Sequence, residues 1–209
     1  MELTQSAYHG EDFTEVDLRN TEIEAVSFDG CDFSGASLVG CRTLRAEFTD
    51  CRFFGSELYS SQHRATSFVG CTFERTAWHS AILDGCRLTG SMFTDCRLVP
   101  LTITECDLTL VSLAGCKLAG TDLSGIRMRE ANLTGTDLTG CDLRGADLSG
   151  ARGVGVVLHR ADLRGASIDA GLWVGAKLAG ARIDVEQAAR FAIAHGLVLA
   201  ADSDDDGET

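Results

Sequence analysis

The sequence lacks a long hydrophobic run, a secretion signal and a surplus of positive charge. No stretch of eighteen apolar residues occurs in the 209 residues, and the N-terminal segment MELTQSAYHGEDF has neither a basic nor an apolar part. These absences argue against a membrane span and a secretory leader. We therefore expect a cytoplasmic protein without membrane association.

Basic residues are scarce. The 18 Lys and Arg residues stand against 31 Asp and Glu residues, and the formal net charge is −13. Binding to nucleic acid phosphates requires a surplus of Lys and Arg, so nucleic acid is not an expected ligand. A partner with a basic surface is expected instead.

Catalytic and metal-binding motifs are also missing. The sequence has no P-loop, no GxSxG and no GxGxxG that opens a helix, and no CxxC or HxxxH spacing. His79 and His159 have no recognisable nucleophile at a useful spacing. We therefore predict no enzymatic activity, no cofactor and no metal site.

Glycine is abundant, with 23 residues against one proline, and it recurs with a period of five. Stepping by five from Leu3 to Ile183 gives thirty-seven central positions, of which only Thr43, His63 and Gly153 are neither aliphatic nor aromatic. The residue two before each centre is mostly small, and the residue two after it is glycine nineteen times. A period of five fits neither a helix nor a strand, so the chain must turn a corner every five residues.

Four such corners close a square coil of twenty residues, with the central residue and the small residue facing inward. Stacked coils would pair through short parallel ladders about 4.8 Å apart, which gives a rod about 43 Å long. We predict an all-β solenoid, a right-handed quadrilateral parallel β-helix of pentapeptide repeats, over residues 1–183.

The nine cysteines all occupy the small inward position: Cys31, Cys41, Cys51, Cys71, Cys86, Cys96, Cys106, Cys116 and Cys141. We interpret them as small buried groups in a reduced chain, rather than as disulfides or zinc ligands. His63 stands at a central position in the same column as Thr43. It is interpreted as a packed, hydrogen-bonded core residue.

The period ends after Ile183, in the segment DVEQAARFAIAHG. Asp184 and Gln187 stand at the positions of a capping box, and Gly196 can end the helix. We predict a short C-terminal capping helix whose apolar stripe covers the last coil, formed by Val185, Ala188, Ala189, Ala192 and Ile193.

Apolar residues around and beyond this helix predict contact between two copies of the chain. The candidate dimerisation residues are Trp173, Phe191, Leu197 and Leu199, and residues 184–200 form the helix and dimerisation segment. Residues 201–209 are predicted to be an acidic, disordered tail.

Acidic residues concentrate in the first coils, where the acids of residues 11–32 oppose only Arg19. The candidate partner-binding acids are Asp12, Asp17, Glu22, Glu24, Asp29 and Asp32. One interpretation is that they only keep the rod soluble. The other is that they imitate a polyanion.

Several segments carry a resemblance to a known family: SSQHRATSFVGCTFERTAWHS (60–80), CRLVPLTI (96–103), LRGADLSGAR (143–152) and ARIDVEQAARFAIAHGLVLA (181–200). With the repeat over 1–183, the chain resembles the pentapeptide repeat proteins, and among them the members that give fluoroquinolone resistance. The resemblance implies a right-handed quadrilateral β-helix, a tail-to-tail homodimer and a surface that imitates B-form DNA. It also implies binding to DNA gyrase in place of DNA, at its ATPase region in the B subunit.

Two hypotheses of function follow. The chain is either a DNA mimic that binds gyrase, modulates it and protects it from fluoroquinolones, or a scaffold that binds another protein through its flat faces. Binding by a polyanion mimic should weaken steeply with salt and compete with DNA, whereas binding through a flat apolar contact should do neither.

Overall fold

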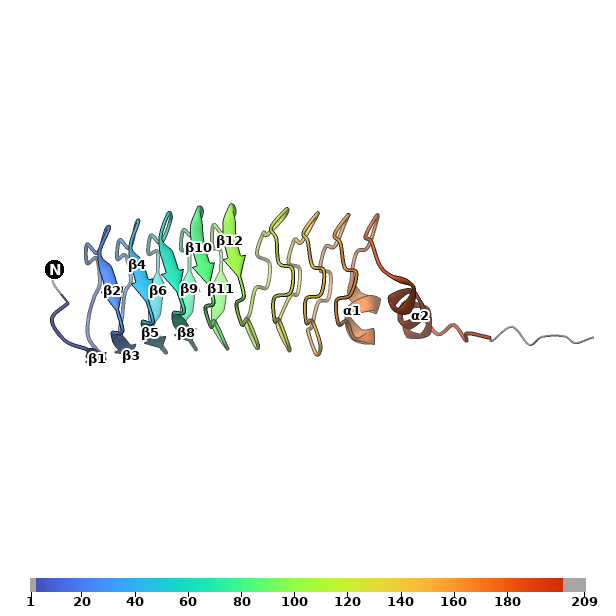
Figure 1. The fold of residues 1–209 in the computed structure, drawn as a ribbon, viewed down its shortest axis with the longest axis horizontal. Helices are drawn as coiled ribbons and strands as arrows, with labels where there is room; N and C mark the ends of the chain where they lie inside the picture. The colour runs from blue at the N-terminus through green and yellow to red at the C-terminus, as the bar shows by residue number, and fades with distance from the viewer. Residues whose placement is uncertain (1–2, 201–209) are drawn as a thin grey trace, which may run out of the picture.

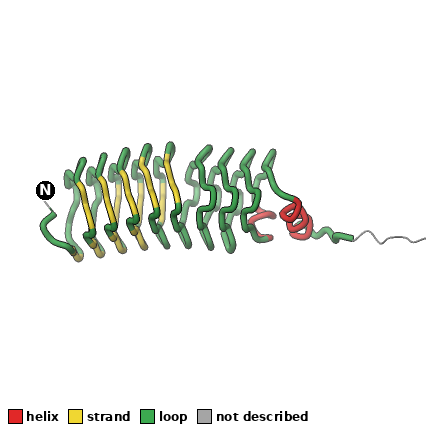
Figure 2. The backbone as a smooth tube through the Cα atoms, in the orientation of Figure 1, coloured by secondary structure: helices red, strands yellow, loops and turns green. Residues whose placement is uncertain are grey.

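The computed structural model describes residues 3–200 as a rod of stacked coils with two helices at its C-terminal end (Figure 1). The strands are β1 (Ala7–His9), β2 (Glu22–Glu24), β3 (Ser27–Asp29), β4 (Arg42–Leu44), β5 (Glu47–Thr49), β6 (Arg52–Phe54), β7 (Gln62–Arg64), β8 (Ser67–Val69), β9 (Thr72–Glu74), β10 (Ala81–Asp84), β11 (Met92–Thr94) and β12 (Leu101–Thr104). The helices are α1 (Ala170–Gly175) and α2 (Val185–Ala194). Figure 2 shows that both helices lie at the same end of the rod.

Each coil has four faces, which we number in chain order. Face 1 holds the sheet β12-β10-β7-β4-β2, face 2 holds β1-β3-β5-β8, and face 3 holds β11-β9-β6. Face 4 is held by isolated parallel bridges, such as Asp17 to Ser37. Corner residues take positive φ angles, for example 64° at Gly40 and 56° at Asn20, because the chain must change direction there.

Every bridge that joins neighbouring coils pairs residues about twenty positions apart. Ala7 pairs with Ser27 in the first coils, and Asp162 pairs with Arg182 near the last. The central residues of the repeat, such as Phe13 and Leu18, are buried. The predicted right-handed quadrilateral parallel β-helix is thus confirmed.

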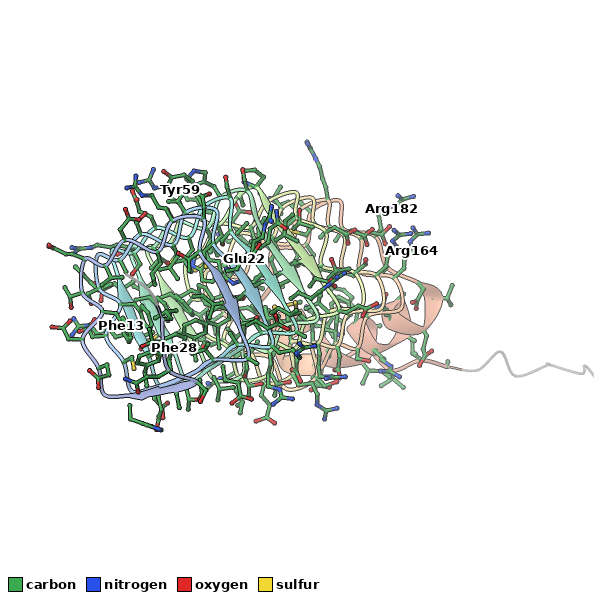
Figure 3. All side chains as sticks on the ribbon, turned by 60° about the vertical axis from the view of Figure 1, so that its left-hand side comes forward. Phe13, Glu22, Phe28, Tyr59, Arg164 and Arg182 are labelled. Carbon is green, nitrogen blue, oxygen red and sulfur yellow. The ribbon has the colours of Figure 1, made fainter. Side chains whose placement is uncertain are left out.

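The core changes character along the rod. In the N-terminal half, face 3 stacks Phe13 on Phe33 and Phe33 on Phe53, with ring centroids 4.8 Å and 5.0 Å apart. Figure 3 shows Phe13 and Phe28 in these first coils. Leucine takes over at most central positions in the C-terminal half. Planar rings stacked between coils add favourable contacts to the burial of apolar surface.

The cysteines face the core as predicted, and all nine are free thiols. Cys51 Sγ donates to the carbonyl of Phe28 at 3.4 Å, so the thiol acts as a small buried donor. Cys96 differs, because it is only partly buried.

Helix α1 was not predicted, because the period-five pattern continues through it. At the central position Gly153 the coil has no side chain, and Leu172 from α1 fills this space and is 1% exposed. A helix residue thus replaces the missing central side chain of face 3.

Helix α2 begins with the predicted capping box. Asp184 accepts the backbone N–H of Gln187, and the Gln187 side chain accepts the backbone N–H of Asp184. The predicted apolar stripe is wrong, however, since Val185 and Ile193 are 87% and 59% exposed. The buried side of α2 is set by Gln187, whose amide donates to the carbonyls of Leu163 and Ala166 at 2.6 Å and 2.8 Å. Hydrogen bonds to the open coil end decide how this helix docks.

The backbone ladder is interrupted at one level of the rod. On faces 4 and 1, no backbone hydrogen bond joins residues 96–105 to residues 116–125, although these segments stack. Pro100, the only proline in the sequence, stands at the corner position where glycines such as Gly120 donate an N–H to the next coil. Proline has no N–H, so this bond cannot form there.

Candidate functional site

The six candidate acids lie around the whole circumference of the rod. Asp12 and Asp32 are neighbours on face 3, and Asp17 lies on face 4. Glu22 and Glu24 flank Ile23 in β2 on face 1, while Asp29 ends β3 on face 2. Because five residues cover only a quarter of a coil, acids close in sequence face different directions. The structure therefore brings them together only in part.

The acids of faces 1 and 4 pair with arginines. Arg42 lies 3.5 Å from Glu22, and Arg45 contacts Glu24. On face 4, Arg19 donates to Asp17 at 2.5 Å and holds the pKa of that carboxyl far below its ordinary value. The field of each of these carboxylates is largely cancelled by its neighbour. The Glu22 side chain is exposed, and Figure 3 labels it on the rod.

The acids of faces 2 and 3 have little such compensation. Asp12 and Asp32 accept the backbone N–H groups of Thr14 and Ser34, each at 2.8 Å. The side-chain and backbone hydrogen bonds from Thr14 lower the pKa of Asp12, so it stays charged. Asp29 has only a contact of 3.5 Å with His9.

These residues belong to a larger group, which we call the acidic edge. It consists of the acids between residues 11 and 50 on faces 2 and 3: Glu11, Asp12, Glu15, Asp29, Asp32, Glu47 and Asp50. Within residues 3–200, none of them forms an ion pair with Lys or Arg. Sequence reasoning missed Glu47 and Asp50, although their position in the twenty-residue coil assigns them to face 2.

Further along the rod, six of the fifteen acids in residues 51–200 pair with arginines. Asp162 lies between Arg164 at 2.6 Å and Arg182 at 3.9 Å, and both arginines lie close together in Figure 3. The hydrogen bond from Arg164 lowers the pKa of Asp162 to about 2. Asp142 pairs with Arg144 in the same way. The unpaired acids are thus densest at the acidic edge, which has seven within residues 11–50 against nine within residues 51–200.

The candidate dimerisation residues separate into two groups. Trp173 is 2% exposed and packs edge-on against Phe191, with ring centroids 5.8 Å apart. Leu197 and Leu199 are exposed. Together with other exposed apolar residues they form what we call the apolar end: Val174, Val185, Ile193, Leu197, Val198 and Leu199.

His63 has a structural role. Its Nδ1 lies 2.8 Å from Thr43 Oγ1 and its Nε2 lies 2.8 Å from Ser61 Oγ, so both ring nitrogens have partners inside the rod. Burial lowers the pKa of His63 to about 3. His79 instead stacks on Tyr59 at the surface, with centroids 4.9 Å apart.

Over residues 3–200, no three His, Cys, Asp or Glu side chains gather in a way that could hold a metal ion. Neither helix in the described part of the chain is long and apolar enough to cross a membrane.

The sequence of this chain is similar to a protein family profile and to a known protein. The family profile "Pentapeptide repeats" matches residues 3–35, 12–53, 106–145 and 131–169. The pentapeptide repeat protein MfpA of Mycobacterium tuberculosis (strain ATCC 25618 / H37Rv) is 53% identical over 194 residues, which covers 92% of this chain and 94% of that protein.

Solved structures of QnrB1, a plasmid-mediated fluoroquinolone resistance protein, share the fold. The full-length structure has a TM-score of 0.80 at 22% identity and covers 91% of this chain and 97% of its own. A trypsin-treated variant of QnrB1 has a TM-score of 0.81 at 23% identity, with 93% and 97% covered.

Proposed function

The chain belongs to the pentapeptide repeat family, and from that premise we propose that it is a DNA mimic that binds DNA gyrase in place of DNA. Binding would modulate the activity of gyrase and protect it from fluoroquinolones in the cytoplasm. The ATPase region of the B subunit is the proposed contact.

The acidic edge is the observation that carries this proposal. Its seven acids occur within residues 11–50, which make two coils and about 10 Å of rod. That is about one negative charge per 1.4 Å, compared with about one per 1.7 Å in duplex DNA. The match is local, because the acids of faces 1 and 4 within the same coils are paired with arginines.

A homodimer through the apolar end would extend this rod. Two rods of about 43 Å placed end to end reach about 90 Å, the length of roughly 25 base pairs. The exposed residues Leu197 and Leu199 are the proposed contacts, and Trp173 and Phe191 hold α2 in place beneath them.

The test compares two triple variants that remove equal charge from the same coils. One neutralises the acidic edge with Asp12→Asn, Asp29→Asn and Asp32→Asn; asparagine keeps the Oδ1 acceptor that Asp12 offers to Thr14. The control neutralises paired acids with Asp17→Asn, Glu22→Gln and Glu24→Gln. Supercoiling and ATP hydrolysis by gyrase are measured with increasing amounts of each protein.

We expect the edge variant to need about tenfold more protein for the same effect, and the control to stay within about threefold of wild type. The effect should also weaken with salt and be lost to competing DNA. If both variants are equally potent, gyrase does not contact this protein through the acidic edge.

The alternative is a scaffold that binds another protein through a flat face. Face 3 favours it, because residues 111–115 and 131–135 carry no charge. If the wild-type protein changes neither supercoiling nor ATP hydrolysis by gyrase, the scaffold becomes the preferred function.

A further inference from the structure

A groove on face 4 lies where the backbone ladder is interrupted. It has a volume of about 410 Å³ and is lined by His79, Cys96, Arg97, Leu98, Val99, Pro100 and Lys117. We call it the proline groove. Its volume is within the range of ordinary ligand sites.

The groove lies beside a junction at which two coils do not pair. The backbone N–H groups of Leu98 and Lys117 would join these coils in a regular ladder, but neither donates to another backbone group. Beneath the groove lies a small apolar cavity of about 30 Å³, and Leu98 lines both spaces.

The hydroxyl of Thr121 gives independent evidence of the same gap. Buried hydroxyls at equivalent positions donate to the carbonyl twenty-three residues earlier, as Ser91 does to Phe68 and Thr136 to Leu113. Thr121 is 5% exposed, yet its Oγ1 has no hydrogen-bond partner, and the equivalent carbonyl is that of Leu98. The coil that carries Leu98 is therefore not hydrogen-bonded to the coil above it at this position.

The groove combines positive charge with an apolar floor. Arg97 and Lys117 are exposed and form no ion pair within residues 3–200, and no acidic residue lines the groove. Val99, which is 43% exposed, forms the floor with Leu98 and Pro100.

The rest of face 4 in the C-terminal part of the rod is also mainly positively charged. From residue 76 to residue 180 this face carries one acid, Asp137, and further basic residues at Arg160 and Lys177. It is thus opposite in charge to the acidic edge.

We propose that the proline groove binds an acidic peptide segment of another protein, with carboxylates on Arg97 and Lys117 and one apolar side chain on Leu98, Val99 and Pro100. Charge complementarity selects an acidic occupant, and the apolar floor favours a peptide over a phosphate backbone. The site is separate from the acidic edge, so it stands whether or not the chain binds gyrase.

Binding can be measured with the full chain and short fluorescein-labelled peptides. Each peptide carries four glutamates around one Leu, Val, Phe or Met, and fluorescence anisotropy follows the titration. Arg97→Gln with Lys117→Gln is the test variant. Arg160→Gln with Lys177→Gln removes the same charge from the same face outside the groove and serves as the matched control.

We expect saturable binding to wild type, a loss of about tenfold in affinity for the test variant and a change below about twofold for the control. Replacing the apolar residue of the peptide by serine should weaken binding by a further several-fold. Bound peptide should also slow alkylation of Cys96, which lines the groove.

Several results would overturn the proposal. These are no saturable binding of any peptide, equal loss in both variants, or no effect of the apolar side chain. Tighter binding of a single-stranded oligonucleotide of equal charge would identify a polyphosphate as the occupant instead.

Discussion

The side chain of Leu172 occupies the space that Gly153 leaves in the wall of the rod. A methyl group on Gly153 would lie 2.3 Å from Leu172 Cδ1 and 2.9 Å from Val156 Cγ1. The helix α1 and the coil beneath it therefore depend on the absence of a side chain at this one central position.

Replacing Gly153 by alanine should destabilise the protein. The new methyl group must displace Leu172 from the core, and overpacking of this kind costs about 1–3 kcal/mol. Urea unfolding measures the free energy of unfolding. Gly171→Ala is the control, because a Cβ there meets nothing within 4 Å. A Gly153→Ala protein as stable as wild type would refute this account of α1.

Gln187→Ala should loosen the C-terminal cap. The variant leaves the carbonyls of Leu163 and Ala166 without their donor, at a cost of about 1–3 kcal/mol. Thermal unfolding should show the loss, whereas Glu186→Ala, which removes only an exposed pair with Arg190, should change stability by less than about 1 kcal/mol. If the two variants have the same melting temperature, the amide does not anchor α2.

Cys96 should be the first thiol to react with a maleimide under native conditions, since the other eight are buried. Burial raises the pKa of Cys96, so the thiolate is scarce at neutral pH. Labelling should accelerate as pH rises, by about tenfold per unit below that pKa. Mass spectrometry of peptides gives the labelled position, and Cys96→Ser provides the blank. Fast labelling of any other cysteine contradicts the described burial.

His63 should make stability depend on pH in mildly acidic solution. The folded protein keeps the ring neutral down to about pH 3, whereas the unfolded chain takes up the proton near pH 6.5. The unfolded state binds more protons between these values, so the free energy of unfolding falls as pH drops, by up to about 1.4 kcal/mol per unit. A His63→Leu variant should show a shallower slope between about pH 6 and 4. Parallel slopes would mean that His63 does not contribute.

Leu197→Ser with Leu199→Ser should convert the proposed dimer to a monomer. Both side chains are exposed in one chain, and two copies would bury them. Light scattering should give twice 22.2 kDa for wild type and 22.2 kDa for the variant. Val154→Ser, an exposed apolar residue elsewhere on the rod, should leave the dimer intact. A monomeric wild type would rule out this contact.

Much of the fold can be predicted from the sequence, because one period fixes which residues face inward. The central column, the small inward cysteines, the buried His63 and the capping box of α2 all follow from residue type and spacing. Each depends on local geometry that repeats with every coil.

Features that depend on contacts between coils could not be predicted in this way. Leu172 takes the place of a central side chain because it fits the space beside Gly153. The ion pair of Glu22 with Arg42 joins two side chains that lie one coil apart. The docking of α2 depends on carbonyls that only an open coil end presents. The gap at Pro100 did have a sequence signal, because a proline stood at a corner that elsewhere donates an N–H.

We expect that gap to divide the rod into two cooperative blocks. In a solenoid each coil is stabilised mainly by its nearest neighbours. Unfolding that spreads from one end therefore stops at the weakest junction between coils. This junction lacks backbone hydrogen bonds on two of its four faces. The core on its N-terminal side is rich in aromatic residues, and the core on its C-terminal side is rich in leucine. Unfolding is then expected in two steps rather than one, with Trp78 on the aromatic side of the boundary as the natural reporter.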